Sequence, residues 1–368
     1  MDKALRRRLV RSLKNAQGDH ASKDSIRLAH GPQRRQRQLA ERVWLDAHRA
    51  RVVLGFAEAS EVDPDNIKPV LVPVTAGTPD ADLFRAATLL WSVPVSRGYG
   101  RRMRFLIRDE ANGKLIGIFA LGDPVFNLKG RDEWIGWDVT ARRQRISSVM
   151  DLYICGAVPP YSFLLGSKLV ASLATSQEVV DRFRQRYSGH RGIISGIVKP
   201  AELLVITTTS ALGRSSLYNR LRLSTDPLTV FREIGYTQGW GHFSVGDRLF
   251  MQLREYLMAE DHRYANGHQF GTGPNWRLRT IRAAMKSLNV DDAFLMHGIQ
   301  RQIFATELCD TSRQMLRDGI KRRRVHRPSA AEIAAAALTR WVRPRYERTG
   351  MPHWSRADVE RLLDGDPD

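Results

Sequence analysis

Hydrophobic and polar positions form their clearest pattern between residues 101 and 138. Segments 103–107 and 115–121 are rich in branched and aromatic side chains, which fit the pleated surface of a strand. The dipeptide Asn112-Gly113 between them suits the positive φ angles of a tight hairpin turn. The pattern therefore predicts two antiparallel strands that lead into a loop ending near residue 138.

Apolar runs and helical periodicities elsewhere predict a mixed α/β protein. Further strands are expected at 68–74, 152–158, 193–198 and 203–208. Helices are expected at 38–60, 82–92, 140–150, 166–173, 176–187 and 215–221. Strands intermixed with helices in this way predict a mixed sheet with helices on its faces.

The chain is expected to become mainly helical from about residue 247. The apolar spacing there predicts helices at 248–259, 277–288, 291–306 and 330–346. The expected organisation is a basic N-terminal arm and helix (1–65), a mixed α/β domain (66–245), a helical basic module (246–325) and a C-terminal helical tail (326–368).

The charge balance favours a polyanionic partner. The 368 residues include 58 Lys and Arg against 39 Asp and Glu, a formal net charge of +19. Such an excess is typical of nucleic-acid-binding proteins, because each neutralised phosphate releases condensed counterions. The alternative is that arginines only replace lysines on solvated faces. Their clustering, as at 6–8 and 34–37, favours nucleic acid, with DNA as the expected partner.

Other bulk features limit the classes of function. Two cysteines, Cys155 and Cys309, are too few for a disulfide framework or a thiolate zinc site, and they indicate a reducing compartment. The longest apolar runs fall short of the ~18 residues that span a bilayer, and no signal-peptide segment follows the start. We expect a cytoplasmic protein that makes no membrane contact. No cofactor is indicated by the sequence.

The loop after the predicted hairpin concentrates acidic side chains. Asp123, Asp132 and Asp138 are the candidate catalytic carboxylates. Such groups suit general acid–base chemistry, or the binding of Mg²⁺ at a reacting phosphate. The alternative is structural, because Asp123 stands in a Gly-Asp-Pro turn and Asp132 has arginine neighbours. Both interpretations stay open at this point.

Basic and aromatic residues around the same loop are candidate nucleic-acid contacts. Trp134 and Trp137 suit stacking on an extruded or unpaired base, although two tryptophans beside Ile135 also suit a hydrophobic core. The arginines expected to contact phosphate here are Arg101, Arg102, Arg104, Arg142 and Arg143.

A second group of candidate contacts lies where a helix is expected to begin near residue 275. Arginines at a helix start oppose the helix dipole and call for a compensating anion, for which phosphate is the natural candidate. The candidates are Asn275, Trp276, Arg277 and Arg279, together with Arg301 on the next expected helix, four positions after His297.

Three separated blocks, residues 96–138, 171–189 and 271–302, carry a family resemblance. In this order they resemble the bacterial DruA-like family of unknown function, found in the Druantia anti-phage system. The resemblance covers most of residues 68–320. It implies a role in phage defence and partner proteins of the same system, such as a helicase. It implies no particular reaction.

The order of strands and helices is also similar to that of the GCN5-related acyltransferase fold. In that fold a glycine-rich turn before the third helix holds the pyrophosphate of acyl-CoA. The corresponding residues 159–168 lack the paired glycines. Tyr218, in the dipeptide Leu217-Tyr218, matches the family's candidate general acid. The alternative is a tyrosine that packs its ring under the sheet.

These observations support three hypotheses and leave open whether the protein is an enzyme. The first is a DNA-associated anti-phage defence protein that binds nucleic acid through basic and aromatic residues. The second is a DNA-base modifying enzyme of acyltransferase-like fold, as the Mom type is. The third is a metal-dependent nuclease or transposase-like enzyme that uses the three aspartates.

Overall fold

The computed structural model describes residues 2–18, 22–95, 100–192, 196–223, 226–266, 274–320 and 326–365. The chain forms two compact units, each assembled from segments distant in sequence. The helical unit comprises Met1–Gln33, Ala211–Gly213 and Tyr236–Arg301. The sheet unit comprises Arg34–Ser210, Arg214–Gly235 and Gln302–Asp368.

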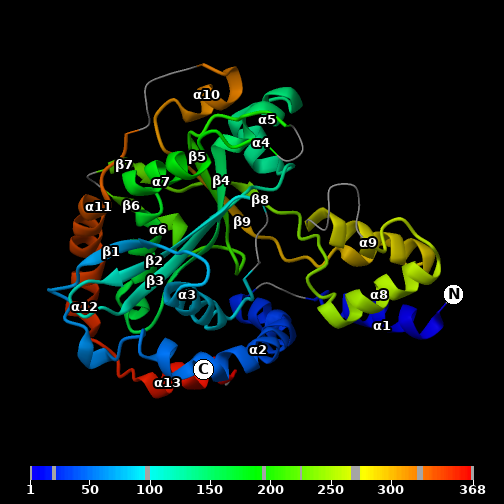
Figure 1. Ribbon diagram of the computed structural model, residues 1–368, viewed down its shortest axis with the longest axis horizontal. Helices are drawn as coiled ribbons and strands as arrows, with labels where there is room; N and C mark the ends of the chain where they lie inside the picture. The colour runs from blue at the N-terminus through cyan, green and yellow to red at the C-terminus, as the bar shows by residue number, and fades with distance from the viewer. Residues whose placement is uncertain are drawn as a thin grey trace. The chain divides into compact units, whose positions relative to one another are not determined.

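A seven-stranded mixed sheet forms the centre of the sheet unit (Figure 1). Its order is β1-β2-β3-β4-β5-β9-β8. β4 and β5 run parallel, whereas β1/β2, β2/β3, β3/β4 and β5/β9 are antiparallel. A separate short ribbon joins β6 to β7. The strands are β1 (Pro69–Pro73), β2 (Arg102–Asp109), β3 (Leu115–Gly122), β4 (Val149–Ala157), β5 (Val205–Thr209), β6 (Arg222–Leu223), β7 (Asp226–Val230), β8 (Arg232–Tyr236) and β9 (Gln302–Glu307).

The predicted hairpin is confirmed as β2 and β3. Phe105 lies opposite Phe119 in the register, and their rings stack with centroids 4.8 Å apart. Gly113 adopts the predicted positive φ, at 72°. All eight residues of β3 are buried, because the strand lies inside the sheet and both of its faces are covered.

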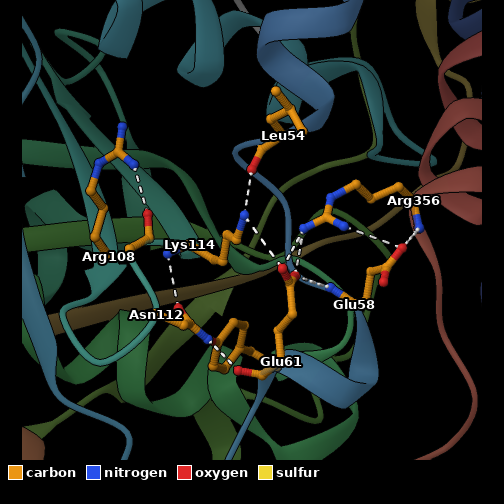
Figure 2. Close-up of polar contacts among 9 residues, drawn as sticks. Leu54, Glu58, Glu61, Arg108, Asn112, Lys114 and Arg356 are labelled. Atoms are coloured by element: carbon orange, nitrogen blue, oxygen red, sulfur yellow. Dashed lines mark hydrogen bonds and ion pairs between the residues drawn. The ribbon is translucent and has the colours of Figure 1, made fainter.

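A polar network anchors the hairpin turn to the rest of the unit (Figure 2). The Asn112 amide donates to the carbonyl of Glu61 at 2.8 Å, and the Lys114 ammonium donates to the carbonyl of Leu54 at 2.9 Å. The Glu61 carboxylate accepts the guanidinium of Arg356 at 2.5 and 2.6 Å. Segments that are far apart in sequence thus meet at this turn.

Helices cover both faces of the sheet. Alternating residues of β2 divide between two hydrophobic cores: Phe105 and Ile107 join one, and Leu106 joins the other. The first core includes side chains of α6 (Gly166–Leu173), α7 (Gln177–Tyr187) and α11 (Ala330–Ala337). The second includes side chains of α2 (Lys23–Val53), α3 (Pro79–Leu89) and α13 (Arg356–Asp364). Short helices complete the unit: α4 (Lys129–Ile135), α5 (Val139–Arg145), α10 (Ser312–Asp318) and α12 (Arg343–Thr349).

The helical unit packs around its own core. It contains α1 (Lys3–Lys14), α8 (Asp247–Ala259) and α9 (Pro274–Ser287). Leu5, Leu9 and Leu13 of α1 are at most 2% exposed and join a cluster with Leu253 and Met285. Residues 3–14 of the basic N-terminal segment are therefore a packed helix, since leucines four apart form an apolar face that α1 buries.

The structure corrects several predicted elements. Residues 291–306 do not form one helix. They form a 3₁₀ turn, Asp292–Leu295, and then reach β9, where β-branched and aromatic side chains pair with β5. The expected helix at 215–221 is only a 3₁₀ turn, Tyr218–Arg220. The expected strand at 193–198 lies partly outside the described residues, and its Val198 forms an isolated bridge.

The predicted fold class is confirmed: a mixed α/β sheet with flanking helices and a mainly helical C-terminal part. No helix in the described part of the chain is both long and apolar enough to cross a membrane.

Candidate functional site

Asp132, a candidate catalytic residue, lies at the centre of a dense hydrogen-bond cluster. Its carboxylate accepts from Arg131 at 2.7 Å, Arg142 at 2.7 Å and the indole N–H of Trp137 at 2.9 Å. The backbone N–H of Leu128 also donates to it. Burial alone would raise the pKa of Asp132, but the charge and hydrogen bonds of Arg131 outweigh burial and hold this pKa below its usual value. The carboxylate is thus kept ionised and fully engaged.

Arg131 shows why this cluster is needed. Its side chain is 0% exposed, and an isolated buried charge is very costly. Besides Asp132, the guanidinium donates to the carbonyls of Val125 and Phe126 at 2.7 and 2.8 Å. Burial lowers the pKa of Arg131. Asp132 therefore neutralises the buried charge of Arg131, whose hydrogen bonds attach residues 125 and 126 of the loop to α4.

Asp123 and Asp138 also have structural partners. Asp123 accepts from both the backbone N–H and the Nε of Arg101, each at 2.9 Å. Asp138 is the N-cap of α5 and accepts from the backbone N–H of Ala141 at 2.7 Å. In the described ranges, no group of three or more His, Cys, Asp or Glu is arranged to hold a metal ion. The catalytic assignment of these acids stays a prediction.

The two tryptophans of the loop occupy different environments. Trp137 is 7% exposed and packs in the main core, with Arg131 at 5.6 Å from its ring. Trp134 is half-buried, and the guanidinium of Arg313 lies 5.0 Å from its ring centroid. Only Trp134 retains partial access to solvent, so a stacking role for Trp137 would require the core to open.

The arginines predicted around this loop differ in their contacts and in their exposure to solvent. Arg101 reaches Asp123 and the rings of α7, and Arg142 pairs with Asp132 and lies 4.6 Å from a phenylalanine ring, that of Phe126. Arg104 lies over a ring of α3. The side chains of Arg102 and Arg143 are exposed to solvent.

A cluster that the sequence analysis did not identify lies where β4 and β5 stop pairing. The parallel pair ends at Asp151 and Thr207, and the Thr207 hydroxyl donates to Asp151 Oδ1 at 3.0 Å. Just beyond, Tyr153 is the extra residue of a β-bulge against β3, between Leu152 and Ile154. Bulges are frequent beside functional sites because they redirect side chains.

The titratable groups of this cluster have perturbed pKa values. Burial raises the pKa of Asp151 to about 6, although the Thr207 hydrogen bond and the charge of Arg131 oppose this increase. Burial raises the pKa of the Cys155 thiol to about 12 and that of Tyr218 well above its usual value. Tyr218 is 7% exposed and packs against two phenylalanine rings. This packing is what the structural alternative for Tyr218, a ring packed under the sheet, would require. Of Asp151, Cys155 and Tyr218, Asp151 has the pKa nearest to neutral pH.

In the helical unit, two of the predicted contacts are engaged within the unit. Trp276 is 8% exposed, and its indole N–H donates to the carbonyl of Tyr264 at 2.9 Å. Arg277 donates to Asp247 at 2.8 Å and to the carbonyl of Val245 at 2.6 Å. The carboxylate of Asp247 and the carbonyl of Val245 thus compensate the positive charge of Arg277, a role for which the sequence had suggested a phosphate. The side chain of Asn275 lies outside the described part of the structure.

Arg301 does not share a helix face with His297, because the predicted helix is absent. It lies one residue before β9, where its Nη2 contacts Nε2 of His30 at 2.9 Å. Burial lowers the pKa of Arg301. The sequence had suggested that Arg301 lies on a helix surface. The structure instead places it just before a strand.

Arg279 has a different environment from its neighbours on α9. It is exposed and lines a hollow of about 770 Å³ in the helical unit. The same hollow is lined by two further cations of α9, Arg282 and Lys286, and by Arg263 and Tyr264 from the segment after α8. Lys286 and Tyr264 were not predicted as contacts, although the spacing of the three basic residues on one helix was visible in the sequence.

The comparisons with known proteins agree on one family. The family model described as Druantia protein DruA matches residues 20–318. Druantia protein DruA of Escherichia coli (strain UMEA 4076-1) is 49% identical over 347 residues, which cover 94% of this chain and 85% of that relative. No solved structure matches the chain. The chain therefore belongs to the DruA family of Druantia proteins.

Proposed function

We propose that this protein is a nucleic-acid-binding component of bacterial anti-phage defence, with DNA as its partner. Its family membership implies the role in defence. The observation that carries nucleic-acid binding is the row of Arg279, Arg282 and Lys286 on α9, which lines one hollow of the helical unit.

The geometry of α9 suits a phosphate backbone. Residues 279, 282 and 286 are three and four positions apart, so their side chains share one helix face. Seven residues of helix cover about 10 Å, and the row can therefore contact more than one phosphate of a strand. Such contacts release counterions and supply affinity without sequence preference.

A salt titration tests this proposal. Wild-type protein and the double variant Arg279→Gln/Lys286→Gln are compared for binding to fluorescent DNA by anisotropy at several salt concentrations. We expect the variant to bind more weakly, and the magnitude of its slope of log K against log salt to be smaller by about 1–2. Arg348→Gln, which removes an exposed arginine of α12 in the sheet unit, is the matched control. Equal slopes for the wild type and the double variant would rule out α9 as the binding surface.

Chemical modification of a DNA base by the sheet unit is a second candidate function. It is favoured by Asp151, which stands at the end of the β4/β5 pairing with its pKa raised to about 6. A carboxylate with such a pKa suits a general base near neutral pH. A mass shift in nucleosides from DNA of cells that express the wild type, absent with Asp151→Asn, would support it.

The nuclease hypothesis receives less support. Asp132 is held by two arginines, Asp123 by Arg101, and Asp138 by the α5 N-terminus. Two-metal phosphoryl transfer needs carboxylates that face a common ion, whereas each of these carboxylates is directed to its own partners. Nicking of DNA that depends on Mg²⁺ and is lost in Asp123→Ala would restore this hypothesis.

A further inference from the structure

Tyr264, on one wall of the hollow, is held in place by residues of α9, which forms another wall. The carbonyl of Tyr264 accepts from the indole N–H of Trp276 at 2.9 Å and from the hydroxyl of Thr280 at 3.0 Å. Both donors belong to α9. Tyr264 is therefore attached to the helix through its backbone, and its aromatic ring is not needed for that attachment.

The cations of the hollow are only partly neutralised. Arg282 pairs with Asp292. Within the described residues, no carboxylate forms an ion pair with Arg263, Arg279 or Lys286. Asp291 and Asp292 also line the hollow, so four cations face two carboxylates and an excess of positive charge remains that attracts anions. The hollow thus favours an anionic ligand.

Tyr264 adds an aromatic surface to this basic hollow. Its ring is half-buried, with the guanidinium of Arg263 4.7 Å from the centroid and the ring of His262 5.6 Å away. Tyrosine rings and guanidinium planes are the groups on which unpaired bases stack. A phosphate alone would use the cations and leave this aromatic surface without a role.

We propose that the hollow binds a short segment of single-stranded nucleic acid, with Arg279 and Lys286 on its phosphates and an unpaired base stacked at Tyr264. This inference rests on the proposed function and narrows its substrate class to unpaired strands. The volume of about 770 Å³ falls in the range of sites that enclose small organic ligands, which suits a base with its sugar. In a duplex the bases are already paired and stacked, so a duplex can offer the hollow only its phosphates.

The experiment compares one single strand and one duplex of equal length, each labelled with fluorescein. Dissociation constants are measured at several salt concentrations for the wild type, Tyr264→Ala, Tyr264→Phe and Arg279→Gln/Lys286→Gln. Thermal unfolding of each variant checks that it folds. Tyr264→Phe keeps the ring and removes the hydroxyl that accepts from Arg263 at 3.0 Å.

We expect Tyr264→Ala to weaken single-strand binding about 10-fold or more, because stacking on an aromatic ring is lost. Its salt slope and its duplex affinity stay unchanged, and Tyr264→Phe binds as the wild type does. The charge variant lowers the salt slope. An unchanged single-strand affinity of Tyr264→Ala overturns this inference, and so does an equal loss with the duplex. If the charge variant alone has an effect, the proposed function stands without the single-strand site. If none of the variants changes the affinity or the salt slope, both the single-strand site and the proposed function fail.

Discussion

The hydroxyl of Thr207 donates to Asp151 Oδ1 at 3.0 Å across the last paired position of β4 and β5. Burial raises the pKa of Asp151 to about 6 in spite of this bond. A folded-state pKa above the unfolded value of 3.8 means that the folded protein binds the proton more tightly. Asp151 therefore does not lower the free energy of unfolding below pH ~4. It lowers that free energy progressively as the pH rises from about 4 to about 6.

Asp151→Asn should remove this penalty. Asparagine has nearly the same shape and can still accept from Thr207, but it carries no charge. We expect the free energy of unfolding at pH 7.5 to rise by about 1–3 kcal/mol, and the difference from the wild type to vanish near pH 4. Urea unfolding at both pH values measures this. A gain that is the same at both pH values would show that ionisation of Asp151 is not the cause.

Asp132→Ala should be more destabilising than Asp138→Ala. It would leave the buried guanidinium of Arg131 without a counter-charge, a loss of about 3–5 kcal/mol for a broken buried pair. Asp138→Ala removes only a helix N-cap, with an expected loss of about 1 kcal/mol. Denaturant unfolding of both variants tests this order. A reversed order would argue against a structural role for Asp132.

Local patterns explain what the sequence could predict. The hairpin follows from two apolar segments and one Asn-Gly turn, all within 21 residues, and the structure confirms it. The structural alternative for Asp132 was also visible locally, because Arg131 and Arg142 are close in sequence. Both features depend on neighbours that a sequence pattern can relate.

Long-range pairing explains what the sequence could not predict. β9 pairs with β5, which lies about one hundred residues earlier, and the helical periodicity assigned to 291–306 gave no sign of that partner. Asp151 carries no local signal either, since its burial arises from β5 and the side chains packed there. Tyr264 becomes part of the basic hollow only through its backbone contacts with α9.

Asp292→Asn should tighten nucleic-acid binding if the hollow of the helical unit is the contact surface. Asp292 pairs with Arg282 in the free protein and would compete with a phosphate for that guanidinium. Removing its charge should increase the affinity several-fold and raise the salt slope by up to about 1. Anisotropy titrations measure both quantities. The control is Asp364→Asn, which removes a carboxylate paired with Arg49 in the sheet unit and should change neither.

Arg356→Met should destabilise the protein in a pH-dependent way. Burial alone would raise the pKa of Glu61, but the N–H of Glu58 and the guanidinium of Arg356 lower it below its usual 4.5. A lowered folded-state pKa contributes stability that is present above pH ~4.5 and is lost as the pH falls through the folded pKa. Both side chains are partly exposed, so we expect a loss of only about 1–2 kcal/mol at pH 7.

The pH dependence separates the charge of Arg356 from its packing. As the pH falls through the lowered pKa of Glu61, its carboxylate becomes protonated, so the difference in unfolding free energy between Arg356→Met and the wild type should shrink. Urea unfolding at pH 7 and pH 3 measures it, with Arg348→Met, an exposed arginine of α12, as the control. A loss of equal size at both pH values would instead assign the effect to the aliphatic part of Arg356. The network around Glu61 would then hold the hairpin turn by packing and not by charge.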